Sequence, residues 1–136
     1  MKKLIETALP LRVLSQSAIS DKAKKGHPGN MHLWWNRSPI DSSTALLMAA
    51  LMDLNTEEFG AKIKQLENIV AGDMPLSLKM NHPPAVCDPF SGFGGLVIAA
   101  QKAGLDVYAS DLNAVATLLT KAVAEIPSRF SDCRPI

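Results

Sequence analysis

The chain of 136 residues lacks long apolar runs, is poor in aromatic residues and holds two cysteines. No stretch reaches the ~18 consecutive apolar residues that a membrane-spanning helix needs. The apolar residues near the start are interrupted by Glu6, Pro10 and Arg12, which is not the pattern of a signal peptide. Cys87 and Cys133 fit no metal or redox spacing and suit reduced thiols. These absences predict a cytoplasmic protein with no membrane association.

A strong charge of one sign is also absent, because the net charge is +1. Apolar residues make up 47% and charged residues 20% of the chain, which is an ordinary globular balance and excludes a disordered protein. Residues 1–40 carry seven Lys or Arg against two acidic residues, a net +5, and the remainder is therefore −4. A basic segment can follow phosphates. Its scattered charges, Lys22, Lys24 and Lys25 among them, fit a solvated helix face better.

Histidine is scarce, and the three that occur do not indicate a metal site. His27, His32 and His82 match no common ligand spacing, and no cysteine or acid converges on them in the sequence. The sequence has no internal repeat and no low-complexity stretch. We therefore predict no bound metal.

The first 84 residues predict helices and loops. Residues 1–40 form a helical and loop extension, and residues 41–84 form a helical region with a linker. The expected elements are a turn or short helix at Lys3–Leu9, a weak helix at Ser15–Lys25, a loop at His27–Pro39, a helix from Asp41 or Ser42 to Asp53, a helix opened by Thr56 and Glu57 and running to about Val70, and a loop at Gly72–Pro84. The apolar stripe from Leu46 to Leu54 is expected to be core.

Residues 85–136 change character. Short apolar runs alternate with helical patterns: a strand at Ala85–Cys87, a glycine loop, a helix at Leu96–Ala103, a strand at Val107–Ser110 and a helix at Asn113–Ile126 closed by Pro127. Strand, loop, helix, strand and helix in this order open a doubly wound sheet. We predict an α/β fold in which residues 85–136 are the first half of a cofactor-binding domain.

The glycine loop has the composition of a nucleotide-cofactor site. Gly92, Gly94 and Gly95 let the backbone turn sharply and approach a ligand, and the following helix points its amino end at it. Asp88 can accept from an ammonium group or bound water. Asp111 stands 19 residues after Gly92, where an acid reaches the hydroxyls of a ribose. The plainer alternative is a tight turn followed by a helix that Asp111 caps.

Two cofactors compete for this geometry. A nicotinamide fingerprint needs a third glycine three residues after the second, and Val97 stands there instead. The lead-in Asp88-Pro89-Phe90 also has no role in dinucleotide binding. S-adenosylmethionine is therefore favoured, and a nicotinamide-dependent oxidoreductase fragment is the rival hypothesis.

The motif from Asp88 to Gly94 resembles the cofactor motif of DNA methyltransferases that methylate an exocyclic amine. Three further stretches resemble one group of them, the large adenine-specific DNA methylases that carry a zinc ribbon and begin with a domain of unknown function. These stretches are Leu4–Leu11, His27–Pro39, and Ala109–Asn113 together with Glu125–Pro127. The resemblance spans nearly the whole chain. It implies a Rossmann-like S-adenosylmethionine methyltransferase sheet, here incomplete, behind a helical amino-terminal extension.

The resemblance also implies residue roles. The expected cofactor-binding residues are Asp88, Phe90, Gly92 and Gly94 in the loop, Asp111 and Asn113 after the second strand, and Pro39 and Ser42 before the first. DNA is the expected partner of the intact enzyme, and Trp35 and Arg37 are the candidates for contacting it, through base stacking and phosphate binding. Because tryptophan is usually largely buried, at least one of Trp34 and Trp35 is expected in the core.

The chain departs from this family in four ways. Arg37-Ser38 stands where two arginines are usual, and Phe93 replaces a small residue, so that it either stacks on the cofactor or narrows the loop. No (Asn/Asp/Ser)-Pro-Pro-(Tyr/Phe) motif, which holds the flipped base, follows Asp111, and Asn81–Pro84 lacks the aromatic. No zinc ribbon is present either.

The missing motif leaves no catalytic residue to assign. We expect the cofactor-binding portion of a DNA adenine methyltransferase, as a truncated gene, a split subunit or a domain fragment. A second chain supplying the base-binding motif is then its expected partner. The alternative is a non-catalytic binding or interaction module that keeps the fold.

Overall fold

The computed structural model describes residues 2–20, 26–35, 37–54, 58–71 and 82–134. The expectations for Lys22, Lys24, Lys25, Thr56 and Glu57, for Asn81 and for most of the loop after residue 71 fall outside these ranges. The helical elements are η1 (Leu4–Glu6), α1 (Leu11–Ser20), η2 (Pro28–Asn30), α2 (Ile40–Leu51), α3 (Phe59–Ala71), α4 (Gly95–Lys102), α5 (Ala114–Thr120), the π-helical η4 (Lys121–Glu125) and α6 (Ile126–Arg129).

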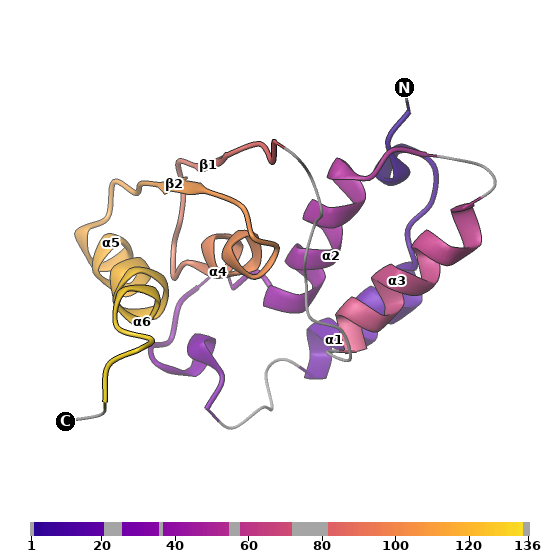
Figure 1. Ribbon diagram of the computed structural model, residues 1–136. Helices are drawn as coiled ribbons and strands as arrows, with labels where there is room; N and C mark the ends of the chain where they lie inside the picture. The colour runs from indigo at the N-terminus through magenta and orange to yellow at the C-terminus, as the bar shows by residue number, and fades with distance from the viewer. Residues whose placement is uncertain (1, 21–25, 36, 55–57, 72–81, 135–136) are drawn as a thin grey trace.

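The described residues form a mixed α/β fold that is mostly helical and has a small parallel sheet. Strand β1 (Val86–Asp88) pairs with β2 (Val107–Ala109), with Val86 opposite Val107 and Asp88 opposite Ala109. Helix α4 connects the strands, as predicted. In Figure 1, α4, α5 and α6 all lie on one side of the two strands. No described element covers the other face, where Cys87 and Tyr108 are exposed.

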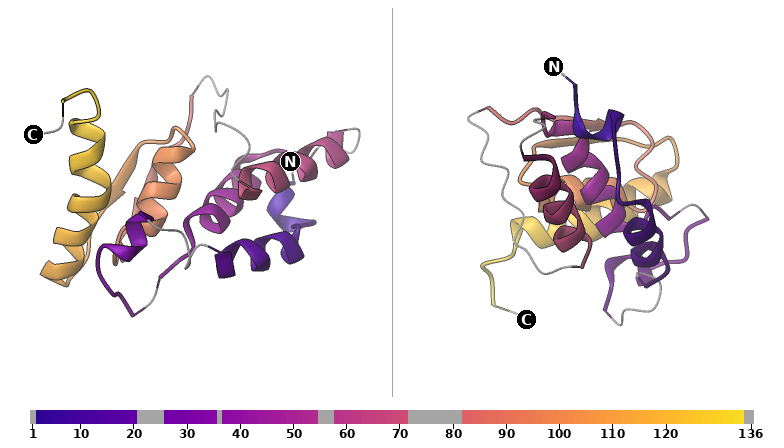
Figure 2. Two further views of the ribbon diagram at one scale, coloured as in Figure 1. Left: turned by 90° about the horizontal axis from the view of Figure 1, so that it is seen from below. Right: turned by 90° about the vertical axis from the view of Figure 1, so that its right-hand side faces the viewer.

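Helix α2 holds the two parts of the molecule together. It packs against η1, α1 and α3 on one side and against α4 on the other, and Figures 1 and 2 show it between these elements. One buried cluster joins residues from all of them and from the end of α4: Leu4, Leu14, Ala45, Met48, Ala49, Leu66, Ile69, Val70, Ala100, Ala103 and Leu105. Thus the segments before and after residue 85 share a core.

The predicted core stripe of α2 is only partly correct. Leu46 is exposed, whereas Ala45, Met48 and Ala49 are buried. Neighbours pack on α2 from two sides. The small Ala45 and Ala49 permit close approach there, Met48 is buried with them, and Leu46 faces outward. The spacing of the apolar residues predicted a helix correctly, but it did not predict which side of the helix is buried.

The start of α2 also differs from the prediction. Pro39 occupies the N-cap position and no side chain caps the helix. Asp41 instead accepts from Lys102 Nζ at 3.0 Å, and the Ser42 hydroxyl donates to the Leu14 carbonyl at 3.0 Å. The two side chains predicted to cap the helix, those of Asp41 and Ser42, therefore form tertiary hydrogen bonds instead, to α4 and to α1.

The last helix runs past Pro127 rather than ending there. α5, η4 and α6 follow one another without a break and form the single rod that Figure 2 shows at the left of its first view. Proline has no N–H and its ring clashes with the carbonyl four residues earlier in an ordinary helix. The wider π turn over Lys121–Glu125 lies over that carbonyl and relieves the clash.

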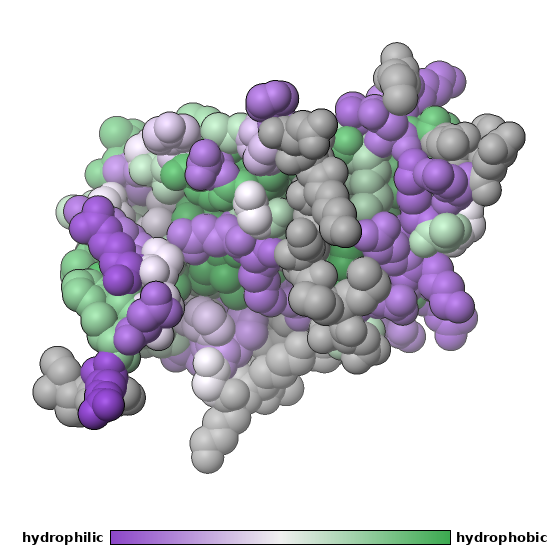
Figure 3. Space-filling model, viewed as in Figure 1, coloured by the Kyte–Doolittle hydropathy of each residue, from purple (hydrophilic) through white to green (hydrophobic). Residues whose placement is uncertain are grey.

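The rod leaves an apolar face toward solvent. Figure 3 shows apolar side chains at the left edge, where Figure 1 places α5 and α6. The exposed apolar residues of this region are Leu112, Val115, Leu118, Ile126 and Phe130. Among the described helices, none is long and apolar enough to cross a membrane.

Candidate functional site

The loop between β1 and α4 is built by its own short-range hydrogen bonds. The Phe90 N–H donates to Asp88 Oδ1 at 3.1 Å, and the Gly94 N–H donates to the Ser91 carbonyl at 2.7 Å. Gly94 is the N-cap of α4 with a φ of 90°, a conformation that glycine adopts without strain. The loop is thus a tight turn that leads directly into a helix.

The same loop is fastened to the end of β2. The Ser91 N–H donates to the Ser110 carbonyl at 3.0 Å, and the Gly92 N–H donates to Asp111 Oδ2 at 2.9 Å. The other carboxylate oxygen of Asp111 accepts from the Asn113 N–H at 2.9 Å. The ends of the two strands therefore bring Asp88 and Asp111 to the same edge of the sheet.

These contacts set the charge state of Asp111. The N–H of Asn113 and then the N–H of Gly92 stabilise its carboxylate and lower its pKa below the usual value, against a smaller opposing effect of burial. Asp111 is therefore ionised at neutral pH. Each of its oxygens keeps acceptor capacity, because a carboxylate oxygen has two lone pairs.

A cleft of about 220 Å³ opens between this loop and the segment that precedes α2. It is lined by Trp34, Ser38, Asp88, Phe90, Ser91, Gly92, Phe93, Gly95, Leu96 and Asp111. Four predicted cofactor residues thus come together here: Asp88, Phe90, Gly92 and Asp111. Asp88 is 8% exposed, whereas Phe90 is 80% exposed at the rim.

The other four predicted cofactor residues do not line the cleft. Gly94 packs against Thr120 and Val123 of the rod. Asn113 caps α5 through its side-chain oxygen, which accepts from the Val115 N–H at 2.9 Å. Pro39 follows Ser38 at the start of α2, and Ser42 is bonded to Leu14. Phe93 and Gly95 beside Gly94, and Ser38 beside Pro39, line the cleft instead, whereas the residues adjacent to Asn113 and Ser42 do not.

A Cβ added at any of the loop glycines Gly92, Gly94 and Gly95 would meet other atoms of the protein. A Cβ at Gly94 would lie 3.1 Å from Val123 Cγ2 and 3.2 Å from Thr120 Cα, and a Cβ at Gly95 would lie 2.7 Å from the Phe93 ring. The space at these two positions is therefore already filled. Phe93 itself is buried with Ile40 and Ala99, so its ring packs under the loop.

The two tryptophans have different surroundings. Trp34 is partly buried against the cluster of Ile40, Phe93 and Ala99, and its Nε1 would lie 3.0 Å from a Cβ at Gly92. Trp35 is 88% exposed and meets the Trp34 ring edge-on, with centroids 5.2 Å apart. The expectation that at least one of them is core is therefore met only in part, because Trp34 packs against the core but stays partly exposed.

Sequence reasoning missed Trp34 and Ser38 as cleft residues. It assigned the neighbouring Trp35 and Arg37 to DNA, and neither of these lines the cleft. Arg37 instead lies near Gly29, where a Cβ would be 3.3 Å from its Nη2. The Trp-Trp pair was the available signal, but a pair of identical side chains does not reveal which one turns inward.

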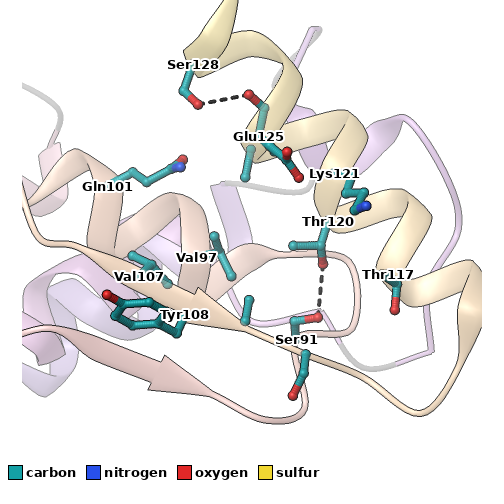
Figure 4. Close-up of a pocket in the computed structure, with 13 residues that line it drawn as sticks. Ser91, Val97, Gln101, Val107, Tyr108, Thr117, Thr120, Lys121, Glu125 and Ser128 are labelled. Carbon is teal, nitrogen blue, oxygen red and sulfur yellow. Dashed lines mark hydrogen bonds between the residues drawn. The ribbon is translucent and has the colours of Figure 1, made fainter.

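A second pocket, of about 330 Å³, lies on the other side of the loop. It is bounded by α4, β2 and the rod of α5, η4 and α6, and Figure 4 shows Val97 and Gln101 facing Lys121 and Glu125 across it. Although larger, it lacks the paired carboxylates at the strand ends. Ser91 belongs to both pockets, so the loop forms the wall between them.

The described residues contain no group of three or more His, Cys, Asp or Glu that is arranged to hold a metal. A family model described as a protein of unknown function, DUF1156, matches residues 8–70. The matched stretch includes Trp34 and Ser38 and ends before the glycine loop. No curated protein matches the chain, and no solved structure matches it.

Proposed function

We propose that this chain is the S-adenosylmethionine-binding portion of a DNA adenine methyltransferase, with a Rossmann-like sheet of which the described strands are the first two. The observation that carries the proposal is the cleft in which Asp88 and Asp111, from the ends of two parallel strands, face the glycine loop. Ligands of open α/β sheets bind at this edge. The match to a family of unknown function neither adds to nor opposes this assignment.

The donor and acceptor set fits a nucleoside. Asp111 is ionised and is held in place by two main-chain N–H groups, so its remaining lone pairs can accept from the two hydroxyls of a ribose. Asp88 Oδ1 accepts from Phe90, and among the described residues no donor is bonded to Oδ2. A cationic or N–H group of the ligand would find its acceptor there.

The size of the cleft indicates that it is one side of a larger site. Its volume of about 220 Å³ is below the roughly 300–1,000 Å³ of pockets that enclose a drug-sized ligand. The uncovered face of the sheet points the same way, because parallel sheets are normally covered on both faces. We therefore propose that further strands complete the site in the intact enzyme.

When bound, S-adenosylmethionine supplies an electrophilic methyl group. The contribution of this chain is to fix the position of that group through Asp111, Asp88 and the loop, which gives a rate advantage by orientation. Trp35 and Arg37 are proposed to contact DNA from outside the cleft. The base-binding tetrapeptide does not follow Asp111 in the sequence, so no residue of this chain is assigned to the adenine amine.

Calorimetric titration of the full chain with S-adenosylmethionine and with NAD tests the proposal. Binding of the first and not of the second is expected. Asp111→Ala should weaken binding about 10- to 100-fold, because it removes charged acceptors. Asp53→Ala is the matched control, since Asp53 pairs with Lys3 far from the loop in sequence and outside the cleft. A folded chain that binds no S-adenosylmethionine would refute the proposal.

A second assay separates the enzyme portion from the alternative of a non-catalytic interaction module. The chain alone should transfer no methyl group to DNA, since it lacks the base-binding motif. Addition of a polypeptide that carries this motif should restore transfer if the chain is one part of a split enzyme. Cofactor binding without any restored transfer would favour the interaction module.

A further inference from the structure

Thr120, the last residue of α5, makes the contact between the rod and the glycine loop. Its hydroxyl donates to Ser91 Oγ at 3.1 Å and to the Gly92 carbonyl at 3.3 Å. A hydroxyl has one proton, so the two acceptors share it. Figure 4 shows Thr120 pointing from the rod toward Ser91, with this hydrogen bond drawn.

Close packing accompanies these hydrogen bonds. Thr120 is 9% and Ser91 6% exposed, so the contact is shielded from water. Directly beside it, Gly94 leaves room for the Thr120 Cα and for Val123, which lie 3.2 and 3.1 Å from where a Cβ would be. The π turn η4 begins at the next residue, Lys121, and brings Val123 onto the same side of the rod as Thr120. π turns of this kind often occur at functional sites.

The loop is thereby held from two opposite sides. The N–H groups of Ser91 and Gly92 donate toward the end of β2, while the carbonyl of Gly92 accepts from Thr120. Thr120 lines the larger pocket and not the candidate cofactor cleft. It is therefore placed to act on the loop without touching a ligand in the cleft.

We propose that Thr120 is a positioning residue that holds the Ser91–Gly92 segment for cofactor binding, through the Ser91 hydroxyl and the Gly92 carbonyl. This inference rests on the proposed function of the cleft. With the hydroxyl in place, the Gly92 N–H is aimed at Asp111 and the carboxylate is oriented toward the ligand. Without it, the Gly92 carbonyl and the Ser91 side chain lose this anchor and the segment is less ordered. The ligand must then order the loop when it binds, which weakens binding.

Thr120→Val tests the proposal because valine keeps the shape and removes the hydroxyl. Calorimetry with S-adenosylmethionine should show binding about 3- to 10-fold weaker than in the wild type, the worth of one such hydrogen bond. Thr120→Ser restores the hydroxyl and should bind within about twofold of the wild type. Thr44→Val makes the same change within α2, where the buried hydroxyl donates to the Ile40 carbonyl at 2.8 Å and lines neither pocket, and it should also bind as the wild type does.

A second measurement follows the loop without any ligand. Hydrogen exchange of the Gly92 amide, observed by NMR, should be about 3- to 10-fold faster in Thr120→Val than in the wild type or in Thr120→Ser. If the valine variant does not fold, Thr120→Ala removes the same hydroxyl with less crowding and replaces it in both measurements.

The outcomes distinguish the two proposals. If the wild type binds and Thr120→Val has the same affinity and the same Gly92 exchange rate as the wild type, the role of Thr120 is overturned while the proposed function stands. The same conclusion follows if Thr120→Ser binds as weakly as Thr120→Val. Absence of binding by the wild-type chain would overturn the proposed function and this assignment together.

Discussion

The main-chain N–H of Gly92 donates to Oδ2 of Asp111 at 2.9 Å, across 19 residues of chain. This bond joins the loop after β1 to the end of β2 at one carboxylate. Because the second oxygen is held by Asn113, the carboxylate has a fixed orientation in the absence of any ligand. A site organised in this way binds without first ordering its acid.

Acid titration should report this bond. The pKa of Asp111 is lowered by the N–H groups of Asn113 and Gly92, so its folded value lies below the roughly 3.9 of an unfolded aspartate. Its stabilising contribution is therefore present above about pH 4 and is lost as the pH falls through the lower, folded value. In Asp111→Asn, the free energy of unfolding, measured by urea denaturation from pH 5 to pH 2, should fall less steeply than in the wild type.

Asp53→Asn is the control for that titration. The pKa of Asp53 is lowered mainly by its hydrogen bond from Lys3 Nζ. In this variant too, the free energy of unfolding should therefore fall less steeply between pH 5 and pH 2 than in the wild type. It should leave cofactor affinity unchanged, since Asp53 does not line the cleft. An Asp111→Asn variant with the full wild-type slope would show that its two N–H bonds do not persist in solution.

A pair of glycine substitutions should separate backbone strain from packing. Gly94 and Gly104 have φ values of 90° and 74°, but only Gly94 has atoms within 4 Å of a new Cβ. Alanine at either position should cost about 1–2 kcal/mol for the left-handed conformation. Gly94→Ala should cost about 1–3 kcal/mol more, because it presses on Thr120 and Val123. Urea denaturation measures both, and equal losses would contradict the close packing.

Tryptophan fluorescence should respond to the ligand through one ring only. Trp34 lines the cleft, whereas Trp35 is exposed outside it. Addition of S-adenosylmethionine should change the emission of the wild type and of Trp35→Phe, and leave that of Trp34→Phe nearly unchanged. If the fluorescence response to the ligand is lost in Trp35→Phe and kept in Trp34→Phe, the ligand binds outside the cleft.

The ion pair between α2 and α4 should matter more than an ion pair within the rod. Lys102 Nζ lies 3.0 Å from Asp41 Oδ1, and the Asp41 side chain is 11% exposed. Lys102→Met should cost about 1–3 kcal/mol, because it takes a partner from a largely buried carboxylate. Arg129→Met removes an exposed pair with Glu125 and should cost at most about 0.5 kcal/mol. Thermal or urea unfolding compares them, and equal costs would argue against Asp41 being buried.

The elements of residues 85–136 could be predicted from the sequence because the patterns that indicate them are local. An apolar run ending at an acid predicted β1 and β2 to within a residue at each end, and Gly104 marked the end of α4. The parallel pairing follows from the intervening helix. The continuation through Pro127 was missed, because a π turn compensates for the proline and has no reliable sequence pattern.

Only part of the candidate site could be predicted from the sequence, because some of its residues are brought together by long-range packing. Asp88 and Asp111 follow from strand ends, which are local features. Trp34 and Ser38 come from a segment more than 50 residues before the loop, and only the packing of α2 against α4 brings it there. The cap assignments of Asp41 and Ser42 were wrong because contacts to Lys102 and Leu14 took precedence over local capping.

The indole nitrogen of Trp34, 3.0 Å from where a side chain on Gly92 would begin, has a consequence for how such chains can diverge. The family model that covers Trp34 ends at residue 70, yet the partner of this ring is residue 92. A lineage that enlarges position 92 has to shrink position 34 or displace the segment before α2. The two stretches should therefore be inherited as one block, with paired substitutions at these positions, and should not be exchanged as independent modules.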